Sequence, residues 1–345
     1  MSDLVERYEA LRQEHRHLRV RDAAQRLGTT EAALVALGLT GAATPLRPDW
    51  PALFAALPRL GVVMALTRNE HAVHERHGAY LDVSSGPGHI LVLGPDIDLR
   101  LFPGRWRHAY ALGGARPSLQ VFDRDGEAAH KIFAVPGVTD MAAWAALVGE
   151  FAITDAPAPP VSAPPAEAAP ADAAVDANAL RSDWLALQDT HDFVKLLRRH
   201  KASRRQALRL AGDDLALPLD PTAAAETLIL AAAGEVPVVI FVGNRSAIQI
   251  HTGPIERLQP SAGGWFNVLD PAFNLHLRES GVAEAWRVVK PTEDGAVTSI
   301  ELLDAAGGVV AQMFGARKPG KPERADWRSL AAQIAERHAL RVPAA

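Results

Sequence analysis

One histidine stands at the start of a predicted helix and could act as a ligand. His191 lies in Asp189-Thr-His-Asp-Phe193, and apolar Phe193, Leu196 and Leu197 follow it at helical spacing. A histidine in such a place can be an ordinary surface or helix-capping residue. A neutral imidazole can also ligate a metal ion or the iron of a haem, and this is the functional interpretation of His191.

Arg100 is the second candidate. The stretch from Asp96 to Leu101 alternates polar and apolar residues, so it predicts a strand with Arg100 on its polar face. An arginine there can be a plain exposed strand residue. It can also be a cation above a bound anion or above an oxygen ligand of a metal, because the guanidinium group stays charged and carries five N–H donors.

A basic run follows His191 and continues over two predicted helices. Its members are Lys195, Arg198, Arg199, Lys201, Arg204, Arg205 and Arg209. They cannot all share one face, so most are expected in solvent, and one or two could hold carboxylates or phosphates. Lys290 precedes Pro291 and is therefore expected in extended backbone, as another anion contact or as a polar edge-strand residue.

Three histidines are spaced as one face of a helix would require. They are His71, His74 and His77, but the repeat of this stretch later in the chain, Ala247–Ile250, has the composition of a strand. On a strand His74 points away from the other two. We therefore expect no metal triad here, and we keep an exposed His74 or His77 as a secondary haem contact.

The elements that must position these residues belong to a sequence repeat that occurs twice in the chain. The stretch 61–133 reappears in the same order from 236 to 314, with an offset that grows slowly, as loop insertions produce. The matched pairs are Asn69 with Asn244, Pro95 with Pro271, Trp106-Arg107 with Trp286-Arg287, and Ser118 with Ser299. Two homologous lobes predict a pseudo-twofold body with a cleft between them, which is a favoured place for a ligand.

The two copies differ at the candidate residues. His276 stands where the first copy has Arg100, and no histidine-bearing counterpart of His191 is evident. One asymmetric ligand in a central cleft would leave such a difference.

The order of elements predicts an α+β fold, a tandem repeat of two lobes, each an antiparallel β-sheet with flanking helices. Helices are expected at 4–16, 20–37, 142–151, 182–200, 203–211 and 325–340, and strands at 62–66, 90–93, 119–122, 238–242, 268–269 and 300–303. Asp125-Gly126 and Gly307-Gly308 are expected to join hairpins. Residues 154–179 are rich in Ala and Pro, which predicts a linker between lobes at 1–153 and 180–345.

The composition narrows the class of protein and the kinds of site that the chain can form. The chain has 345 residues, 48% of them hydrophobic, a net charge of −4 and no cysteine. Disulfides, thiolate metal sites and a cysteine nucleophile are excluded, and nucleic acid or anionic membrane is not attracted by bulk charge. No apolar run approaches the roughly 20 residues that span a bilayer, and the charged N-terminus is unlike a signal peptide. We expect a cytoplasmic protein without membrane insertion.

Several pieces of the chain together resemble one family. They are Met64–Glu75, Asp96–Phe102, Asp189–Phe193, Gln249–Ile255, Trp265–Pro271 and Asn274–Arg278. They resemble the HemS/ChuS/HmuS/PhuS group of bacterial cytoplasmic haem-degrading and haemin transport proteins. The resemblance covers nearly the whole chain except the Ala/Pro-rich linker.

The resemblance implies one haem b, as ligand or substrate, between the lobes. The axial iron ligand falls on His191, and the distal arginine, with a catalytic role, on Arg100 beside Phe102. Arg204 and Lys290 fall near the haem propionates, and Gln312 and Phe314 fall in the pocket. The chain departs from the family at Asp192, where some relatives carry a second histidine, and at Phe314, where a tyrosine is expected.

Three functions follow as expectations. The first is oxidative haem degradation that releases iron with an external electron donor. The second is a haem carrier that works with a haem importer or delivers to a separate haem oxygenase. The third is a DNA-binding regulator, because Arg21–Leu34 has the rhythm of a helix-turn-helix; the acidic net charge opposes it, and we expect no nucleic-acid partner.

Overall fold

The computed structural model describes residues 2–16, 18–162, 175–260, 263–317 and 320–340. By contacts the chain forms two compact units. Unit 1 comprises Met1–Arg68, Glu75–Ala166 and Asn244–Gln249, and unit 2 comprises Asn69–His74, Glu167–Gly243 and Ile250–Ala345. Each unit thus includes a short segment from the other half of the sequence. The lobe boundaries expected from the sequence stay a prediction.

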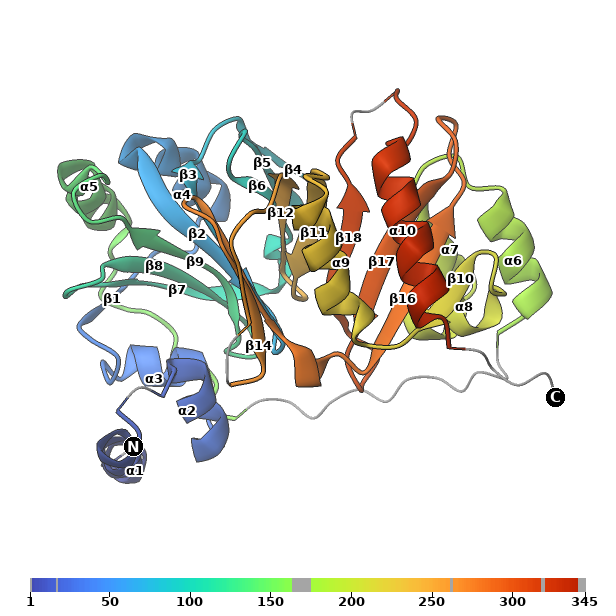
Figure 1. The fold of residues 1–345 in the computed structure, drawn as a ribbon. Coiled ribbons are helices and arrows are strands. Elements are labelled where there is room, and N and C mark those ends of the chain that lie inside the picture. Colours follow the sequence, from blue (N-terminus) through green and yellow to red (C-terminus); the bar gives the residue numbers. More distant parts are fainter. Residues whose placement is uncertain (1, 17, 163–174, 261–262, 318–319, 341–345) are drawn as a thin grey trace. The chain divides into compact units, whose positions relative to one another are not determined.

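The first half of the chain holds five helices and nine strands among the described residues (Figure 1). They are α1 (Ser2–Glu14), α2 (Val20–Leu27), α3 (Glu31–Ala36), β1 (Ala43–Pro45), α4 (Trp50–Ala56), β2 (Val62–Arg68), β3 (Ala72–Ala79), β4 (Val83–Gly86), β5 (His89–Leu93), β6 (Asp98–Leu101), β7 (Trp106–Leu112), β8 (Ser118–Asp123), β9 (Ala128–Ala134) and α5 (Met141–Phe151).

The second half repeats this order. It holds α6 (Ala177–Leu185), α7 (Asp192–Arg199), α8 (Arg204–Leu210), β10 (Ala216–Leu219), α9 (Ala223–Ala233), β11 (Val238–Gly243), β12 (Ala247–Gly253), β13 (Leu258–Pro260), β14 (Trp265–Leu269), β15 (Phe273–Arg278), β16 (Glu284–Lys290), β17 (Val297–Leu303), β18 (Val309–Gly315) and α10 (Ala325–His338). Each half begins with three helices. A strand, a helix, eight strands and a closing helix follow in that order. The α+β tandem repeat expected from the sequence is confirmed.

In unit 1 the antiparallel strands run in the order β1-β7-β8-β9-β2, and β4, β5 and β6 form a further antiparallel set. Neighbouring residues of β7 face opposite sides, because side chains alternate along a strand. Ala109 and Ala111 belong to the core with α4 and α5, whereas Tyr110 and Leu112 pack with α3. The five strands are thus covered on both faces.

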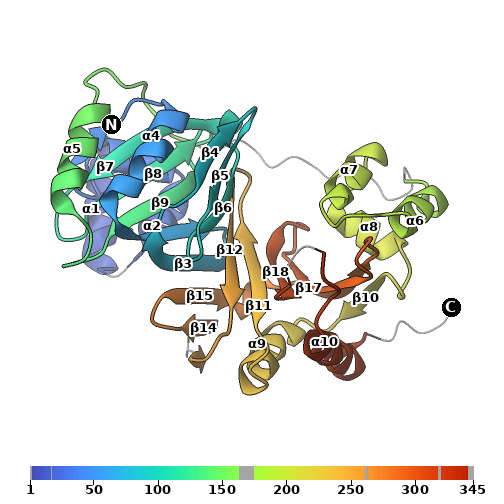
Figure 2. The same ribbon diagram turned by 90° about the horizontal axis from the view of Figure 1, so that it is seen from above.

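Unit 2 is built in the same way, with the order β10-β16-β17-β18-β11. Ile300 and Leu302 of β17 pack with α9 and α10, whereas Leu303 packs with the group α6, α7 and α8. Figure 2 shows α9 and α10 on one side of β16–β18 and the other three helices on the opposite side. Glu301 therefore faces the side of α6–α8, because it alternates with Ile300 and Leu302.

The expected strands and hairpins are confirmed, and two expected helices are wrong in extent. The stretch 20–37 is two helices, because Gly28 ends α2 in the left-handed region with φ of 66° and the Thr30 hydroxyl caps α3 at Ala33 N, 3.1 Å away. The stretch 182–200 is likewise divided into α6 and α7. The sequence interpretation missed α4 and α9. In the described part of the chain no helix is long and apolar enough to cross a membrane.

The match of Trp106 with Trp286 is wrong in register. Trp106 lies opposite Asp123, whereas Trp286 lies opposite Glu301, although Asp123 corresponds to Asp304 in the repeat. A β-bulge after Trp106 shifts the pairing of β7 with β8, and the loops that join the paired strands differ in length. The strands themselves remain equivalent, because Ser118 lies opposite Phe133 and Ser299 lies opposite Phe314.

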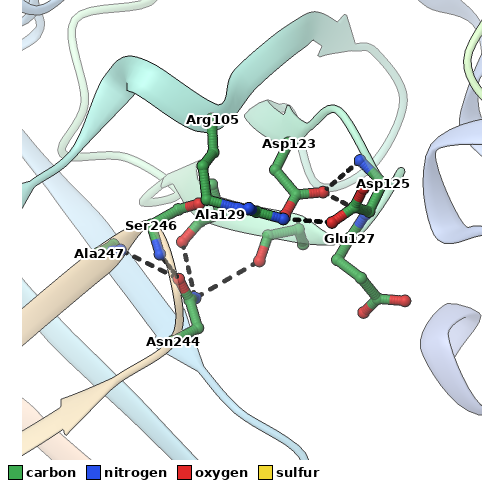
Figure 3. Close-up of polar contacts among 9 residues, drawn as sticks. Arg105, Asp123, Asp125, Glu127, Ala129, Asn244, Ser246 and Ala247 are labelled. Atoms are coloured by element: carbon green, nitrogen blue, oxygen red, sulfur yellow. Dashed lines mark hydrogen bonds and ion pairs between the residues drawn. The ribbon is translucent and has the colours of Figure 1, made fainter. Parts of the chain in front are cut away.

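Asn244 shows how the repeat is built locally (Figure 3). Its side-chain oxygen accepts from the backbone N–H groups of Ser246 and Ala247, at 2.9 and 3.0 Å. Its amide nitrogen donates to the carbonyls of Arg68 and Ala129, both at 3.0 Å. One side chain thus closes a tight turn and attaches that turn to β2 and β9 of unit 1.

Asn69 repeats this arrangement in unit 2. It accepts from His71 N and Ala72 N at 3.0 and 2.9 Å, and donates to the carbonyls of Gly243 and Val310 at 3.0 and 2.9 Å. The two asparagines matched in the sequence therefore make matching hydrogen bonds.

Candidate functional site

His191 stands at the N-cap position of α7, and its side chain is 90% exposed. Its Nδ1 lies 2.6 Å from Asp189 Oδ1, which also accepts from His191 N at 2.8 Å. The hydrogen bond at Nδ1 orients the ring, and the hydrogen bond from the backbone N–H fixes the carboxylate beside it. With the proton on Nδ1, the lone pair on Nε2 is directed away from Asp189, and this is the orientation that a metal-ligating histidine needs.

The same contacts act on the carboxylate. Hydrogen bonds from the backbone N–H and the ring of His191 outweigh partial burial and hold the pKa of Asp189 below its usual value. Asp189 therefore stays ionised at neutral pH. The exposed imidazole and the anion behind it form a pair suited to iron ligation.

Arg100 lies on β6 in unit 1 and is half-buried. Its Nη1 forms an ion pair with Asp98 and lies 3.3 Å from the carbonyl of Leu99. A guanidinium carries further donors on Nε and Nη2. Burial raises the pKa of Asp98, and the positive charge of Arg100 opposes that rise. Phe102 follows β6 and is 39% exposed, which is high for a large apolar side chain.

Arg204 and Lys290 share one buried carboxylate in unit 2. Glu301 is 0% exposed; its Oε1 accepts from Lys290 Nζ at 2.5 Å and from the Ser299 hydroxyl at 3.1 Å, and its Oε2 accepts from Arg204 Nη1 at 2.7 Å. Burial alone would raise the pKa of Glu301, but the two cations outweigh it and bring the pKa to about 2. The cluster therefore carries two positive charges and one negative charge.

Two aromatic rings complete this cluster. Arg204 and Lys290 lie over the ring of Phe193, at 5.0 and 4.8 Å from its centroid, and Lys290 lies 5.9 Å from the ring of Phe314. Gln312, on β18, is the strand partner of Glu301 and is half-buried. Four residues singled out from the sequence, Arg204, Lys290, Gln312 and Phe314, are thus brought together around β17.

Lys290 differs from what its proposed role requires. It is only 3% exposed, and burial lowers its pKa, while Glu301 opposes that shift. A direct contact from Lys290 to a ligand carboxylate would need the side chain to become accessible. Arg204 keeps an accessible part, so of the two cations it is the one placed to meet an anion from outside.

The expectation of an exposed His74 is wrong. His74 lies on β3, is 0% exposed and packs edge-on against Phe273 with ring centroids 5.0 Å apart. Phe273 in turn stacks on buried His251 at 3.7 Å. Because β3 pairs as a strand, His74 is turned inward, whereas His77 stays half-buried. A haem contact by His74 remains a prediction that requires a change in this packing.

Two residues of the candidate site were missed from the sequence. Glu301 lies between Ile300 and Leu302 in a strand whose residues are all buried. A charged residue within such an apolar strand is itself a signal, because a buried charge needs partners. Asp189, two residues before His191, is the other; nothing in its type or spacing alone distinguished it from other aspartates that precede helices.

The helix-turn-helix rhythm has a structural explanation. α2 and α3 are joined by a short turn, but residues 31–35 of α3 are all buried. This helix packs on Tyr110 and Phe122 of unit 1. A recognition helix must present side chains to a DNA groove. α3 does not, so its pattern reflects packing.

Comparison with known proteins gives a consistent answer. The haemin-degrading HemS/ChuX domain matches the chain twice, at residues 28–151 and 201–334. Hemin transport protein HmuS of Yersinia pestis is 40% identical over 339 residues, which are 96% of this chain and 97% of that protein. Hemin transport protein HemS of Yersinia enterocolitica is 40% identical over 91% of this chain and 92% of that protein.

Solved structures agree over the whole length. Apo-PhuS, described as a heme-binding protein from Pseudomonas aeruginosa, superposes with a TM-score of 0.91 at 48% identity, over 96% of this chain and 98% of PhuS. ChuS, described as a heme degrading enzyme of Escherichia coli O157:H7, superposes with a TM-score of 0.88 at 35% identity, over 96% and 98%. With its domain present in two copies, the chain belongs to the HemS/ChuX family, in the group of HemS, HmuS, PhuS and ChuS.

Proposed function

We propose that this protein binds one haem in the cytoplasm, with His191 as the axial ligand of the iron. The proposal is supported by the family and by one observation above all, the exposed imidazole whose Nδ1 is held by Asp189 at 2.6 Å. Haem supplies the redox chemistry when it is bound. The chain's own task is to hold the macrocycle, orient it and place charges around it.

Arg100 is proposed as the catalytic residue. Asp98 holds its Nη1, so the guanidinium is oriented before any ligand arrives. A positioned cation stabilises negative charge that develops near it during a reaction, and a preorganised donor does so without further reorganisation. Phe102 is proposed to provide apolar contact beside it.

Arg204 is proposed to meet a propionate of the haem. Its guanidinium is held by Glu301 through Nη1, and two cations on one carboxylate leave an excess positive charge for an anionic ligand. Half-buried Phe314 and Gln312 are proposed as further contacts. With Phe at position 314, no phenolic hydroxyl is available there as a hydrogen-bond donor.

We propose that the bound haem is opened by dioxygen, with electrons from an external donor, and that its iron is then released. Support comes from the 35% identity over nearly the whole chain with a protein described as a heme degrading enzyme. The test is to incubate the purified haem complex with a reductant under air in the presence of catalase. Loss of the Soret band with iron release is expected. An unchanged Soret band without iron release would exclude degradation.

A haem carrier is the second candidate. It is favoured by the 40% identity with two hemin transport proteins and by the exposure of His191, because an accessible axial ligand can be exchanged for that of an acceptor. A carrier would take haem from an importer or deliver it to a separate haem oxygenase. Transfer of haem to an apo-haem oxygenase, without a change in the macrocycle, would identify this function.

A further inference from the structure

Glu301 is a fully buried carboxylate that has so far been given a role only beside Arg204 and none toward the iron ligand. It lies on β17, on the face of that strand that α6, α7 and α8 cover. Burying a charge costs several kcal/mol unless partners compensate it. A residue with this cost requires an explanation from either stability or function.

We propose that Glu301 is a positioning residue for His191, acting through Arg204, Lys290 and the ring of Phe193. This inference rests on the proposed function, because it concerns the ligand of the haem iron. It adds a residue from β17, far from His191 in the sequence, to the determinants of haem coordination.

The connection consists of direct contacts. Glu301 accepts from Arg204 at 2.7 Å and from Lys290 at 2.5 Å. Both cations lie over the ring of Phe193, at 5.0 and 4.8 Å from its centroid. Phe193 is in the first turn of α7, is fully buried and lies two residues after His191. The carboxylate thus holds two cations against the turn that carries the ligand.

The repeat shows that the fold does not need a carboxylate at this place. The residue of unit 1 that corresponds to Glu301 is Gln120, two residues after Ser118 as Glu301 is two after Ser299. Gln120 is also buried and donates to the Ser118 hydroxyl at 3.0 Å, whereas at the equivalent place the Ser299 hydroxyl donates to Glu301 at 3.1 Å. A neutral glutamine is therefore accommodated at this strand position, although its Oε1 is buried without a hydrogen-bond partner, and the negative charge of Glu301 is a feature of unit 2.

Removal of this charge has a defined consequence. The groups that face Glu301 are Arg204 from α8, Lys290 from β16, Ser299 from its own strand and Gln312 from β18. Without the carboxylate, Lys290 is buried beside Arg204 with only aromatic rings to offset its charge. Burial and a neighbouring cation both favour the neutral amine. Its proton would then be lost at a lower pH, and the packing over Phe193 would become sensitive to pH.

The test uses Glu301→Gln in the full-length chain, with Glu31→Gln as the matched control. Glu31 is a buried carboxylate of unit 1 and pairs with Lys131. Each purified protein is titrated with hemin between pH 6 and 10, and the Soret position, the reduction potential of the bound iron and the dissociation constant are measured. For Glu301→Gln we expect binding weaker by about tenfold or more, which is typical when a partner behind a metal ligand is lost. We also expect a shifted potential and a pH transition that the wild type and Glu31→Gln lack.

The outcomes separate the two proposals. If Glu301→Gln matches the wild type in Soret position, potential and pH profile while His191→Ala does not, the positioning role is overturned and the proposed function stands. If the wild type itself forms no haem complex, both are overturned. Should Glu301→Gln fail to fold, Phe193→Leu provides the second measurement. It keeps apolar packing and removes the ring, and an unchanged haem spectrum and pH profile in that variant would equally overturn the inference.

Discussion

Both units join the start of a corresponding helix to the sheet by a buried ion pair, but the polarity is opposite and the strand partner stands on neighbouring, not equivalent, strands. In unit 1 the first residue of α3, Glu31, follows the cap Thr30 and pairs with Lys131 on β9. In unit 2 the first residue of α8, Arg204, follows the cap Ser203 and pairs with Glu301 on β17. A helix start is thus attached to a sheet by an ion pair in both units, with the signs exchanged.

The difference lies in what surrounds each pair. Glu31 forms an ion pair with Lys131 and also acts on the charge of the half-buried Arg68 guanidinium, whereas Glu301 accepts hydrogen bonds directly from both Lys290 and Arg204. The excess positive charge of unit 2 lies over Phe193, in the helix that begins beside exposed His191. The duplicated fold therefore accepts either sign of charge at the helix start that pairs with the sheet.

His191→Ala should give the largest effect, because it removes the one exposed imidazole with no counterpart in the first copy. Loss of partners one step behind a metal ligand costs about 10–100-fold in affinity, so loss of the ligand itself should cost at least as much and shift the Soret band. A hemin titration measures both. The control is His276→Ala, in the repeat position of Arg100. If it changed the spectrum more than His191→Ala, the ligand would be misassigned.

Arg100→Ala tests the contribution of unit 1, as His191→Ala tests that of unit 2. Hemin binding should be largely kept, while turnover should fall about 10²–10³-fold, the usual cost of losing a positioned donor. The measurement is the rate of Soret loss under reductant and air. Arg76→Ala is the matched control, since Arg76 is also a strand arginine of unit 1 in an ion pair, with Asp96 at 2.7 Å. Equal rates in the two variants would contradict a special role for Arg100.

A third test concerns a buried histidine in the core of unit 1 that has no counterpart in the core of unit 2. Unit 1 buries His130 between the hydroxyls of Thr67 and Tyr80, at 2.8 and 2.6 Å, where the repeat has Ala311. Burial lowers the pKa of His130 to about 3. The imidazole of the unfolded chain binds a proton near pH 6.5. The stability that the neutral, buried His130 contributes is therefore fully present above that pH and is lost progressively as the pH falls toward about 3.

His130→Ala should therefore reduce the loss of unfolding free energy on acidification by a few kcal/mol, although the cavity that it leaves lowers stability at every pH. Denaturant unfolding followed by tryptophan fluorescence at pH 7.5 and pH 4.5 measures the difference. If wild type and variant lose the same free energy between these pH values, the histidine is not the titrating group.

Asp189→Asn should give the smallest effect. An amide still reaches His191 Nδ1 but does not add negative charge to the ring, so hemin affinity should fall by about tenfold and the potential of the bound iron should rise. Asp189 has a lowered pKa, so its contribution is present above about pH 4 and is lost as the pH falls through that lowered value. Asp192→Asn, next to the ligand and paired with Lys195 at 2.7 Å, is the control. An equal effect in both variants would point to general charge and not to orientation of the ring.

Local rules accounted for much of the fold. Short strand-like runs identified β2, β8, β11 and β17, alternation identified β6, and the turns at Asp125-Gly126 and Gly307-Gly308 join hairpins as expected. The helices α4 and α9 escaped notice because short or uniformly apolar segments show no clear period. The register of Trp106 was missed for a different reason, since a match of residue types does not show which residues lie opposite one another in a sheet.

The residues of the candidate site also fall into two groups, those that the sequence identifies and those whose surroundings only the structure shows. His191 could be picked out because it stands at a helix start with a recognisable chemistry, and Arg204 because the family resemblance places a basic residue there. The burial of Lys290 and His74, and the place of Glu301, depend on which strand edge and which helix cover them, and those neighbours come from distant parts of the chain.

The order of residues alone was enough for the duplication, the absence of thiol chemistry and the family, because these depend on which residues are present and how they recur. Which charges are buried, which partner each one meets and which imidazole faces outward were settled only by packing. The free energy of a charge depends on the groups around it in space, and pairs such as Arg204 with Glu301 are brought together only when the helices close over the sheet.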